Sequence, residues 1–124
     1  MHHVAIGVPD LERAQAFYAV LGFSLEVAYR TGGGRRACWV VGPHGRVELF
    51  EADPRPPDAE HGGILHLALE VRDIDAVLAR LVAAGARQLG PVAARTMDGR
   101  PYRTVFVHDP DGVALELLEP SSSV

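Results

Sequence analysis

The sequence predicts an α+β fold made of two tandem β-α-β-β-β modules, whose curved mixed sheets surround a cavity. Two observations support this prediction. Residues 3–11 resemble residues 66–74, with histidine, alanine, valine and aspartate at matched places after a shift of 63 (66 minus 3). Residues 47–51 likewise resemble residues 115–119, with a shift of 68 (116 minus 48). Two copies are too few for a solenoid, so a pseudo-symmetric domain with a site between its halves is expected.

The length of 124 residues suits one compact domain, residues 1–124. Within it we expect module one at residues 1–51, a linker at residues 52–63 and module two at residues 64–124. Three prolines lie in that linker, and they exclude a helix or a central strand there. The hydrophobic fraction of 48% is ordinary for a globular protein and allows a core.

One helix is expected in each module, directly after the first strand. Asp10 and Asp73 are suited to begin these helices, because a short carboxylate accepts hydrogen bonds from the free amides of the first turn. Gly22 and Gly85 are placed to end them, since glycine adopts the left-handed conformation of a helix end at little cost. The apolar residues between these limits recur with helical spacing, so one face of each helix should pack on a sheet.

Eight short strands are expected, four in each module, because apolar and β-branched residues alternate between turn signals rich in glycine, proline and aspartate. They are placed near residues 3–8, 23–30, 35–41, 46–51, 65–71, 87–94, 102–108 and 113–119.

Composition excludes several classes of function. Twelve basic and sixteen acidic residues give a net charge of −4, which argues against a protein that binds nucleic acid. No apolar run is long enough to cross a bilayer, and the N-terminal residues do not have the pattern of a signal peptide. Cys38 is the single cysteine, so no internal disulfide is required. A cytoplasmic protein that binds a small molecule is expected.

Four polar residues share the sheet faces that the helices leave free. Side chains of a strand alternate between its two faces, and the apolar residues of each first and last strand have one parity. The other parity carries His3 and Glu48 in module one, and His66 and Glu116 in module two. Their neighbours of that parity are small and leave room for a ligand: Ala5, Gly7, Ala68 and Ala114.

Two histidines and two glutamates in one cavity would suit a divalent metal ion. Imidazole nitrogens and carboxylate oxygens bind Zn²⁺, Ni²⁺, Co²⁺, Mn²⁺ or Fe²⁺. A single histidine on a strand is more often a hydrogen-bonded structural residue, and a single glutamate is usually solvated. The repetition of both at matched places favours a metal site, because a solvent-exposed face gives no reason for it. The pattern does not decide whether the site lies within one chain or between two.

Three further motifs lie outside the internal repeat, at residues 16–18, 21–23 and 106–112. Together with residues 3–11 and 66–69, they resemble the vicinal oxygen chelate superfamily, which includes glyoxalase I, bleomycin resistance proteins and extradiol dioxygenases. The resemblance covers nearly the whole chain. The resemblance specifies the fold but gives little information about the substrate.

This resemblance implies a ligand set and an assembly. The metal positions of the family fall on His3, Glu48, His66 and Glu116, which all hold metal-capable residues. Members usually form homodimers, and in many of them each site combines the first half of one chain with the second half of the other. A homodimer with a divalent metal ion is therefore expected.

The two-histidine, two-glutamate set favours a lyase or isomerase of the glyoxalase type. Such an enzyme binds the oxygen of a small carbonyl compound to the metal and removes a proton from the adjacent carbon. Glu48 and Glu116 are the candidate bases, with Glu116 preferred because its strand follows a well-formed turn. One alternative is an Fe(II)-dependent ring-cleaving dioxygenase, which typically uses two histidines and one carboxylate. The other is an antibiotic-binding protein of the bleomycin-resistance type that sequesters its ligand.

Two further groups of residues could contact a substrate. A four-residue hairpin at Gly42–Gly45 would place Trp39 opposite Glu48, on the face of the candidate site, although a strand tryptophan usually serves packing. Arginines near two glycine turns could hold a carboxylate or phosphate, although arginines near turns are usually solvated. They are Arg35, Arg36, Arg95, Arg100 and Arg103.

Overall fold

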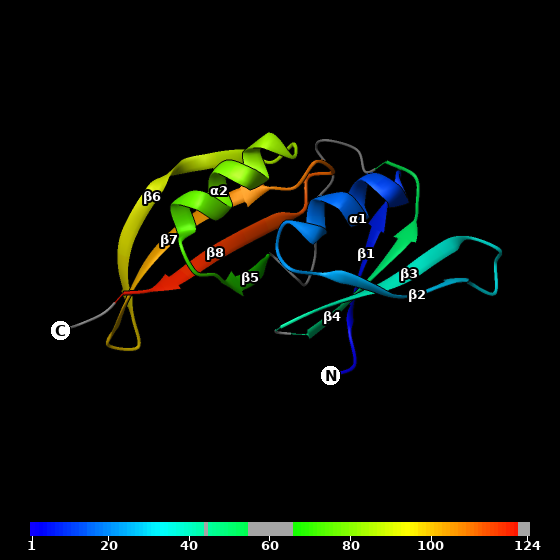
Figure 1. The fold of residues 1–124 in the computed structure, drawn as a ribbon, viewed down its shortest axis with the longest axis horizontal. Helices are drawn as coiled ribbons and strands as arrows, with labels where there is room; N and C mark the ends of the chain where they lie inside the picture. Colours follow the sequence, from blue (N-terminus) through cyan, green and yellow to red (C-terminus); the bar gives the residue numbers. More distant parts are fainter. Residues whose placement is uncertain (44, 55–65, 122–124) are drawn as a thin grey trace. The chain divides into compact units, whose positions relative to one another are not determined.

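The computed structural model describes residues 1–43, 45–54 and 66–121 (Figure 1). The chain divides into two compact units, Met1–Pro57 and Asp58–Val124. Most of the predicted linker at residues 52–63, and the centre of the Gly42–Gly45 turn, lie outside the described residues.

Both units have the predicted β-α-β-β-β order, so the α+β fold class with two tandem modules is confirmed. The first unit contains β1 (Val4–Val8), α1 (Leu11–Ala19), β2 (Ser24–Arg30), β3 (Arg36–Gly42) and β4 (Gly45–Glu51). The second contains β5 (Leu67–Glu70), α2 (Ile74–Ala83), β6 (Arg87–Met97), β7 (Arg100–His108) and β8 (Ala114–Pro120). Neither helix is long and apolar enough to cross a membrane, within the part of the chain that the structure describes.

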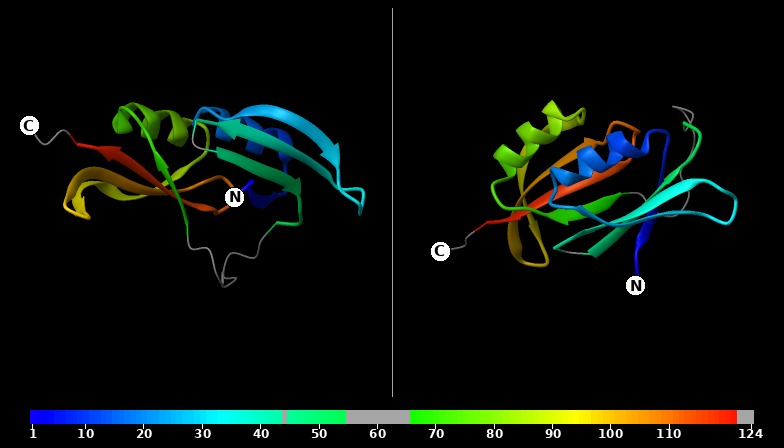
Figure 2. Two further views of the ribbon diagram at one scale, coloured as in Figure 1. Left: turned by 90° about the horizontal axis from the view of Figure 1, so that it is seen from below. Right: turned by 45° about the vertical axis from the view of Figure 1, so that its right-hand side comes forward.

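Each unit has one mixed sheet of four strands. The strand orders are β1-β4-β3-β2 and β5-β8-β7-β6, and Figure 2 shows both sheets from two further sides. The first strand of each unit pairs in parallel with the last, and the other neighbours are antiparallel. Since the middle of each sheet consists of the last two strands, the residues that precede β1 and β5 lie beside the last strand of their own unit.

Strand β6 is longer than predicted, because it runs to Met97 rather than ending near residue 94. Asp98 and Gly99 have φ angles of 52° and 70°. Two consecutive residues with positive φ are the signature of a tight type I′ hairpin turn. Such a turn allows pairing up to its edge, so Met97 pairs with Arg100 and the ladder is extended.

The helices begin and end where the sequence predicts. Oδ1 of Asp10 accepts a hydrogen bond from the third amide of α1 at 2.9 Å, and Asp73 does the same for α2 at 3.3 Å. Gly22 and Gly85 have φ angles of 89° and 107°. In both cases the amide after the glycine bonds the carbonyl five residues earlier, at 3.2 and 2.9 Å. This Schellman arrangement turns the chain back toward the sheet and starts the next strand.

In each unit the helix covers one face of the sheet, and the core lies between them (Figure 1). The apolar parity of the strands points into this core, as predicted. Val8 and Leu49 are fully buried in the first unit, and Leu115 and Leu117 in the second. The opposite parity, which includes both candidate glutamates, therefore lies on the face away from the helix.

An ion triad joins α2 to its sheet on the core side. The guanidinium of Arg103, on β7, donates two hydrogen bonds to Asp75 in the first turn of α2, at 2.9 and 3.1 Å. Arg103 also lies 3.6 Å from a carboxylate oxygen of Glu119, at the end of β8. Glu119 in turn accepts a hydrogen bond from the amide of Ile74 at 2.9 Å. The triad thus connects the start of the helix to two strands.

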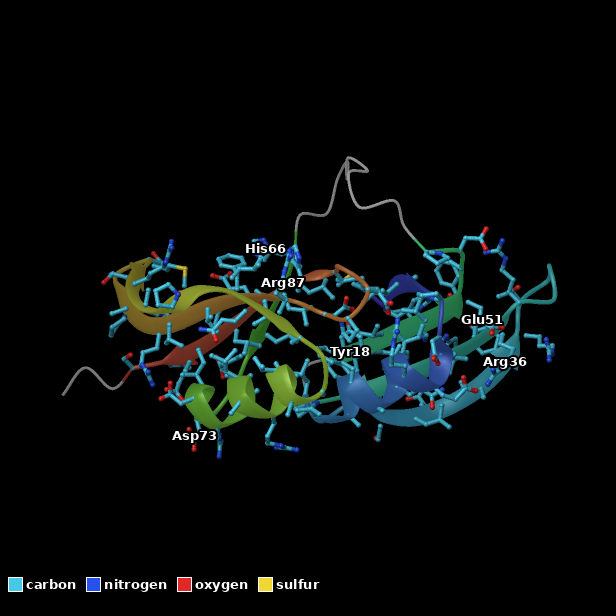
Figure 3. The ribbon with its side chains drawn as sticks, turned by 90° about the horizontal axis from the view of Figure 1, so that it is seen from above. Tyr18, Arg36, Glu51, His66, Asp73 and Arg87 are labelled. Atoms are coloured by element: carbon cyan, nitrogen blue, oxygen red, sulfur yellow. The ribbon has the colours of Figure 1, made fainter. Side chains whose placement is uncertain are left out.

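The first unit repeats this triad at equivalent positions. Arg36, on β3, donates to Glu12 in the first turn of α1 and lies 3.8 Å from Glu51 at the end of β4. Figure 3 shows Arg36 beside Glu51. Because Arg36 and Arg103 share the parity of the core residues, they do not face the predicted site. For these two arginines, the structure favours a structural role over substrate binding.

The Arg103 triad should make stability depend on acidity. The hydrogen bond from Arg103 holds the pKa of Asp75 below its ordinary value of 3.8, with burial opposing this effect. A depressed carboxylate pKa in the folded state stabilises the protein above the unfolded pKa, and this contribution is lost as the pH falls through the folded pKa. Arg103→Gln should therefore lower the Tm at pH 7, and the deficit should shrink below pH 3.8. Thermal denaturation, monitored by circular dichroism at roughly eight pH values between about 2.5 and 7, measures this Tm deficit.

Arg95→Gln is the matched control, because Arg95 also lies on a strand of the second unit but makes no side-chain hydrogen bond or ion pair with the described residues. Its Tm deficit should be small at every pH. A deficit of Arg103→Gln that stays constant down to the lowest pH would show that the charge pair with Asp75 is not its cause.

Candidate metal centre

In the first unit, His3 and Glu48 form one pair of candidate ligands. His3 directly precedes β1, and β1 runs parallel to β4 with Ala5 opposite Glu48. This register brings Nε2 of His3 to 3.3 Å from Oε2 of Glu48. The two side chains are 29% and 18% exposed, so both remain accessible to a small ligand.

In the second unit, His66 and Glu116 form the equivalent pair. His66 directly precedes β5, as Figure 3 shows, and Ala68 lies opposite Glu116 in the parallel pairing of β5 with β8. Nε2 of His66 lies 3.3 Å from Oε1 of Glu116. The exposed fractions of the side chains are 35% and 12%. The same register therefore produces the same contact in both units.

The separation within each pair fits two adjacent ligands of one divalent ion. Bonds of about 2.1 Å that enclose an angle of about 90–109° place two ligand atoms about 3.0–3.4 Å apart. Both observed separations, 3.3 Å, lie in this range. The small exposed neighbours Ala5 and Ala68 leave space beside the pairs. The donor types and their spacing thus suit a transition metal ion.

Two ligands are too few for a complete site. Among residues 1–43, 45–54 and 66–121, no group of three or more histidine, cysteine, aspartate or glutamate side chains forms a metal site. The structure therefore places the four predicted ligands in two pairs, one pair in each unit. Their combination into one site remains a prediction.

An aromatic residue on the neighbouring strand lies directly opposite each candidate glutamate. Trp39 on β3 is paired with Glu48, as the sequence predicts, and Phe106 on β7 is paired with Glu116. Each ring also contacts the histidine of its pair, with centroids 5.9 Å apart for His3 and 5.2 Å apart for His66. Phe106 was not predicted, although counting back across the turn at residues 109–112 places it opposite Glu116.

Tyr29 is a site residue that the sequence did not indicate. Its hydroxyl donates a hydrogen bond to Oε2 of Glu48 at 2.5 Å. Nε1 of Trp39 lies 3.2 Å from the same oxygen and 3.1 Å from the Tyr29 hydroxyl. Burial, followed by the hydrogen bond to Glu48, raises the pKa of Tyr29 above its ordinary value. Tyr29 is therefore a hydrogen-bond donor to Glu48 at neutral pH.

The N-terminal residues add a second contact to His3. Nδ1 of His2 lies 2.8 Å from Nδ1 of His3, so one of these two nitrogens carries the shared proton. The ring of His2 also stands edge-on to Trp39, with centroids 4.9 Å apart. A partner on the second ring nitrogen is the usual means of orienting a histidine that binds metal. His2 can thus leave Nε2 of His3 free for that role.

Comparison with known proteins now identifies the family. The model of the "Glyoxalase/Bleomycin resistance protein/Dioxygenase superfamily" matches residues 1–117, which include all four candidate ligands. The chain belongs to this superfamily. The resemblance that the sequence motifs suggested is therefore confirmed, and so is the glyoxalase-like fold.

Individual members of the superfamily are similar over nearly their whole length. An uncharacterized protein of Escherichia coli, YaeR, is 37% identical over 96% of this chain and 95% of its own. An ethylmalonyl-CoA/methylmalonyl-CoA epimerase of Cereibacter sphaeroides is 35% identical over 94% of this chain and 95% of its own. A glyoxalase family protein of Bacillus cereus has a TM-score of 0.79 and 26% identity, covering 98% of this chain and 94% of that one.

Proposed function

We propose that this protein is a metal-dependent isomerase or lyase that removes a proton from the carbon next to a metal-bound carbonyl oxygen of a small substrate. The observation that carries the proposal is the repeated His–Glu pair, with the same separation of 3.3 Å in both units. A structural histidine would have no reason to recur with the same carboxylate partner at the same register.

The chain is an enzyme of the isomerase or lyase type, in agreement with the epimerase among its relatives. The substrate is a further proposal. Because that relative is named for acyl-CoA thioesters, which carry a carbonyl beside an acidic C–H bond, we propose a substrate of this general chemistry.

The proposed ligands are His3, Glu48, His66 and Glu116. A divalent ion held by them would supply Lewis-acid polarisation of the carbonyl group. The remaining work falls to the side chains of the protein. One carboxylate must lie within hydrogen-bond reach of the acidic C–H bond and accept its proton. Trp39 and Phe106, which line the same sheet faces, would limit access of water to the reacting atoms.

We further propose that the protein acts as a homodimer. Each His–Glu pair is half of a ligand set, so two pairs must meet, either within one chain or between two. If two chains share each site, mixing His3→Ala with Glu116→Ala should restore metal binding at one of the two sites. Sedimentation as a monomer at micromolar concentration, together with full metal binding, would exclude the shared arrangement.

The test of the function combines metal binding with proton exchange. The purified protein, stripped of metal with a chelator, should gain thermal stability on addition of Co²⁺, Zn²⁺, Ni²⁺ or Mn²⁺. The metal-loaded protein should then catalyse exchange of the acidic hydrogen of methylmalonyl-CoA, or of another carbonyl compound in a panel, for deuterium in D₂O. Stabilisation by a flat apolar antibiotic, without metal and without exchange, would instead support sequestration.

A further inference from the structure

The two candidate carboxylates have unequal surroundings, despite the equal geometry of their pairs. Oε2 of Glu48 is contacted by His3, by the hydroxyl of Tyr29 at 2.5 Å and by Nε1 of Trp39 at 3.2 Å. Within the described part of the chain, the carboxylate of Glu116 has one polar contact, with His66. One glutamate is therefore held by two neutral donors, and the other is not.

The second unit lacks the residues that could hold Glu116 in the same way. Phe106 occupies the position equivalent to Trp39, since each is the cross-strand partner of its glutamate, and a phenyl ring has no donor. Tyr29 is paired with Ala37 in the first unit, and the corresponding pair in the second is Ala93 with Thr104. Alanine thus stands where the phenol would be. The difference follows from side-chain identity and not from backbone placement.

A carboxylate with two donors can still bind a cation. An ionised carboxylate offers about four lone-pair sites, so two hydrogen bonds leave acceptor capacity for a metal. Hydrogen bonds to a ligating carboxylate fix its orientation and raise its affinity for the ion. Before it could move, however, such a carboxylate would have to break both hydrogen bonds. Glu48 is therefore suited to remain in place, whereas Glu116 can rotate after breaking a single contact.

We propose that Tyr29 and Trp39 are positioning residues that would hold Glu48 as the fixed carboxylate ligand of a divalent ion, while Glu116, which has fewer contacts, would be the carboxylate that accepts the proton. This inference rests on the proposed function, because it presumes that both glutamates belong to one metal site. It assigns a role to Tyr29, whose hydroxyl contacts both Glu48 and Trp39.

Titration of the chelator-treated protein with Co²⁺ alone tests the proposal. Tyr29→Phe removes one donor and keeps the ring, and Trp39→Phe gives the first unit the aromatic residue that the second unit has. Each change should weaken Co²⁺ binding about 10- to 100-fold, the usual effect of losing an outer-shell partner. Isothermal titration calorimetry gives the Kd, and the visible absorption of bound Co²⁺ should shift because the ligand field changes.

Tyr102→Phe is the matched control, because the Tyr102 hydroxyl makes no hydrogen bond with the described residues. It should bind Co²⁺ like the natural protein. The Tm of metal-free Tyr29→Phe should equal that of Tyr102→Phe, since a purely structural defect would lower it. Glu48→Gln should weaken Co²⁺ binding more than Glu116→Gln does, because the fixed ligand contributes more to affinity.

The outcomes separate this inference from the function on which it rests. If the natural protein binds Co²⁺ but Tyr29→Phe and Trp39→Phe bind it equally well, the positioning role is wrong and the metal site stands. If Glu116→Gln weakens binding more than Glu48→Gln, the roles of the two glutamates are reversed. If the natural protein does not bind Co²⁺ at all, the proposed function itself fails.

Discussion

Glu116→Gln is expected to keep its metal and to lose exchange of the substrate hydrogen for solvent deuterium. Glutamine has the shape of glutamate and still offers an oxygen to a metal ion, but it cannot accept a proton. Removal of a general base typically costs about 10²- to 10⁴-fold in rate. The side chain of Glu116 is 12% exposed, and His66 is its single polar partner among the described residues, so the substitution disturbs little else there.

Proton NMR in D₂O measures the exchange, and elemental analysis of the same sample measures the metal. Glu70→Gln is a suitable comparison, because Glu70 lies on β5 but makes no side-chain hydrogen bond or ion pair with the described residues. It should exchange at the natural rate. If both Glu48→Gln and Glu116→Gln also exchange at that rate, proton transfer by these carboxylates is wrong, and oxygen chemistry or ligand sequestration becomes the better explanation.

The second large effect is expected for His66→Ala, which removes a proposed ligand outright. Loss of an outer-shell partner costs about 10- to 100-fold in metal affinity, and loss of a direct ligand should exceed that range. The side chain of His66 is 35% exposed and packs edge-on against Phe106. A truncation at this partly exposed position should therefore leave the fold intact while the metal content falls to background.

His108→Ala provides the control for this prediction. His108 lies on β7 in the same sheet, and its Nδ1 contacts the guanidinium of Arg87 at 3.1 Å rather than a carboxylate. Its removal should leave the metal content unchanged. Equal metal content in His66→Ala, His108→Ala and the natural protein would overturn the assignment of the metal site.

The fold could be predicted from the sequence because its signals are local and repeated. Asp10, Gly22, Asp73 and Gly85 determine the helix limits through hydrogen bonds within a few residues of each other. Strand parity, which depends only on alternation, placed the four candidate ligands on the face away from the helices. The end of β6 was wrong by three residues, since the two-residue turn that extends it requires positive φ at Asp98, a conformation that aspartate adopts only in context.

The site residues that could not be predicted from the sequence depend on strand registers that the alternation pattern does not determine. Trp39 was placed correctly because the turn between β3 and β4 is short. Tyr29 reaches Glu48 from β2, whose pairing of Tyr29 with Ala37 is set by the longer loop at residues 31–35. The length of such a loop does not by itself determine the register of the strands that it joins. The asymmetry between the two glutamates therefore became visible only with the side chains in place.

The duplicated ion triads have a consequence for how the molecule opens. Each triad lies within a single unit and joins the start of the helix to the two central strands of the sheet. Native-state hydrogen exchange resolves such local openings, because amides of one cooperative segment share a common free energy of exposure. Loss of the Arg103 triad should speed amide exchange along α2 and leave the rates along α1 unaltered. Each unit could therefore open locally without the other. A ligand that is bound by donors of both units would reduce local opening in each of them.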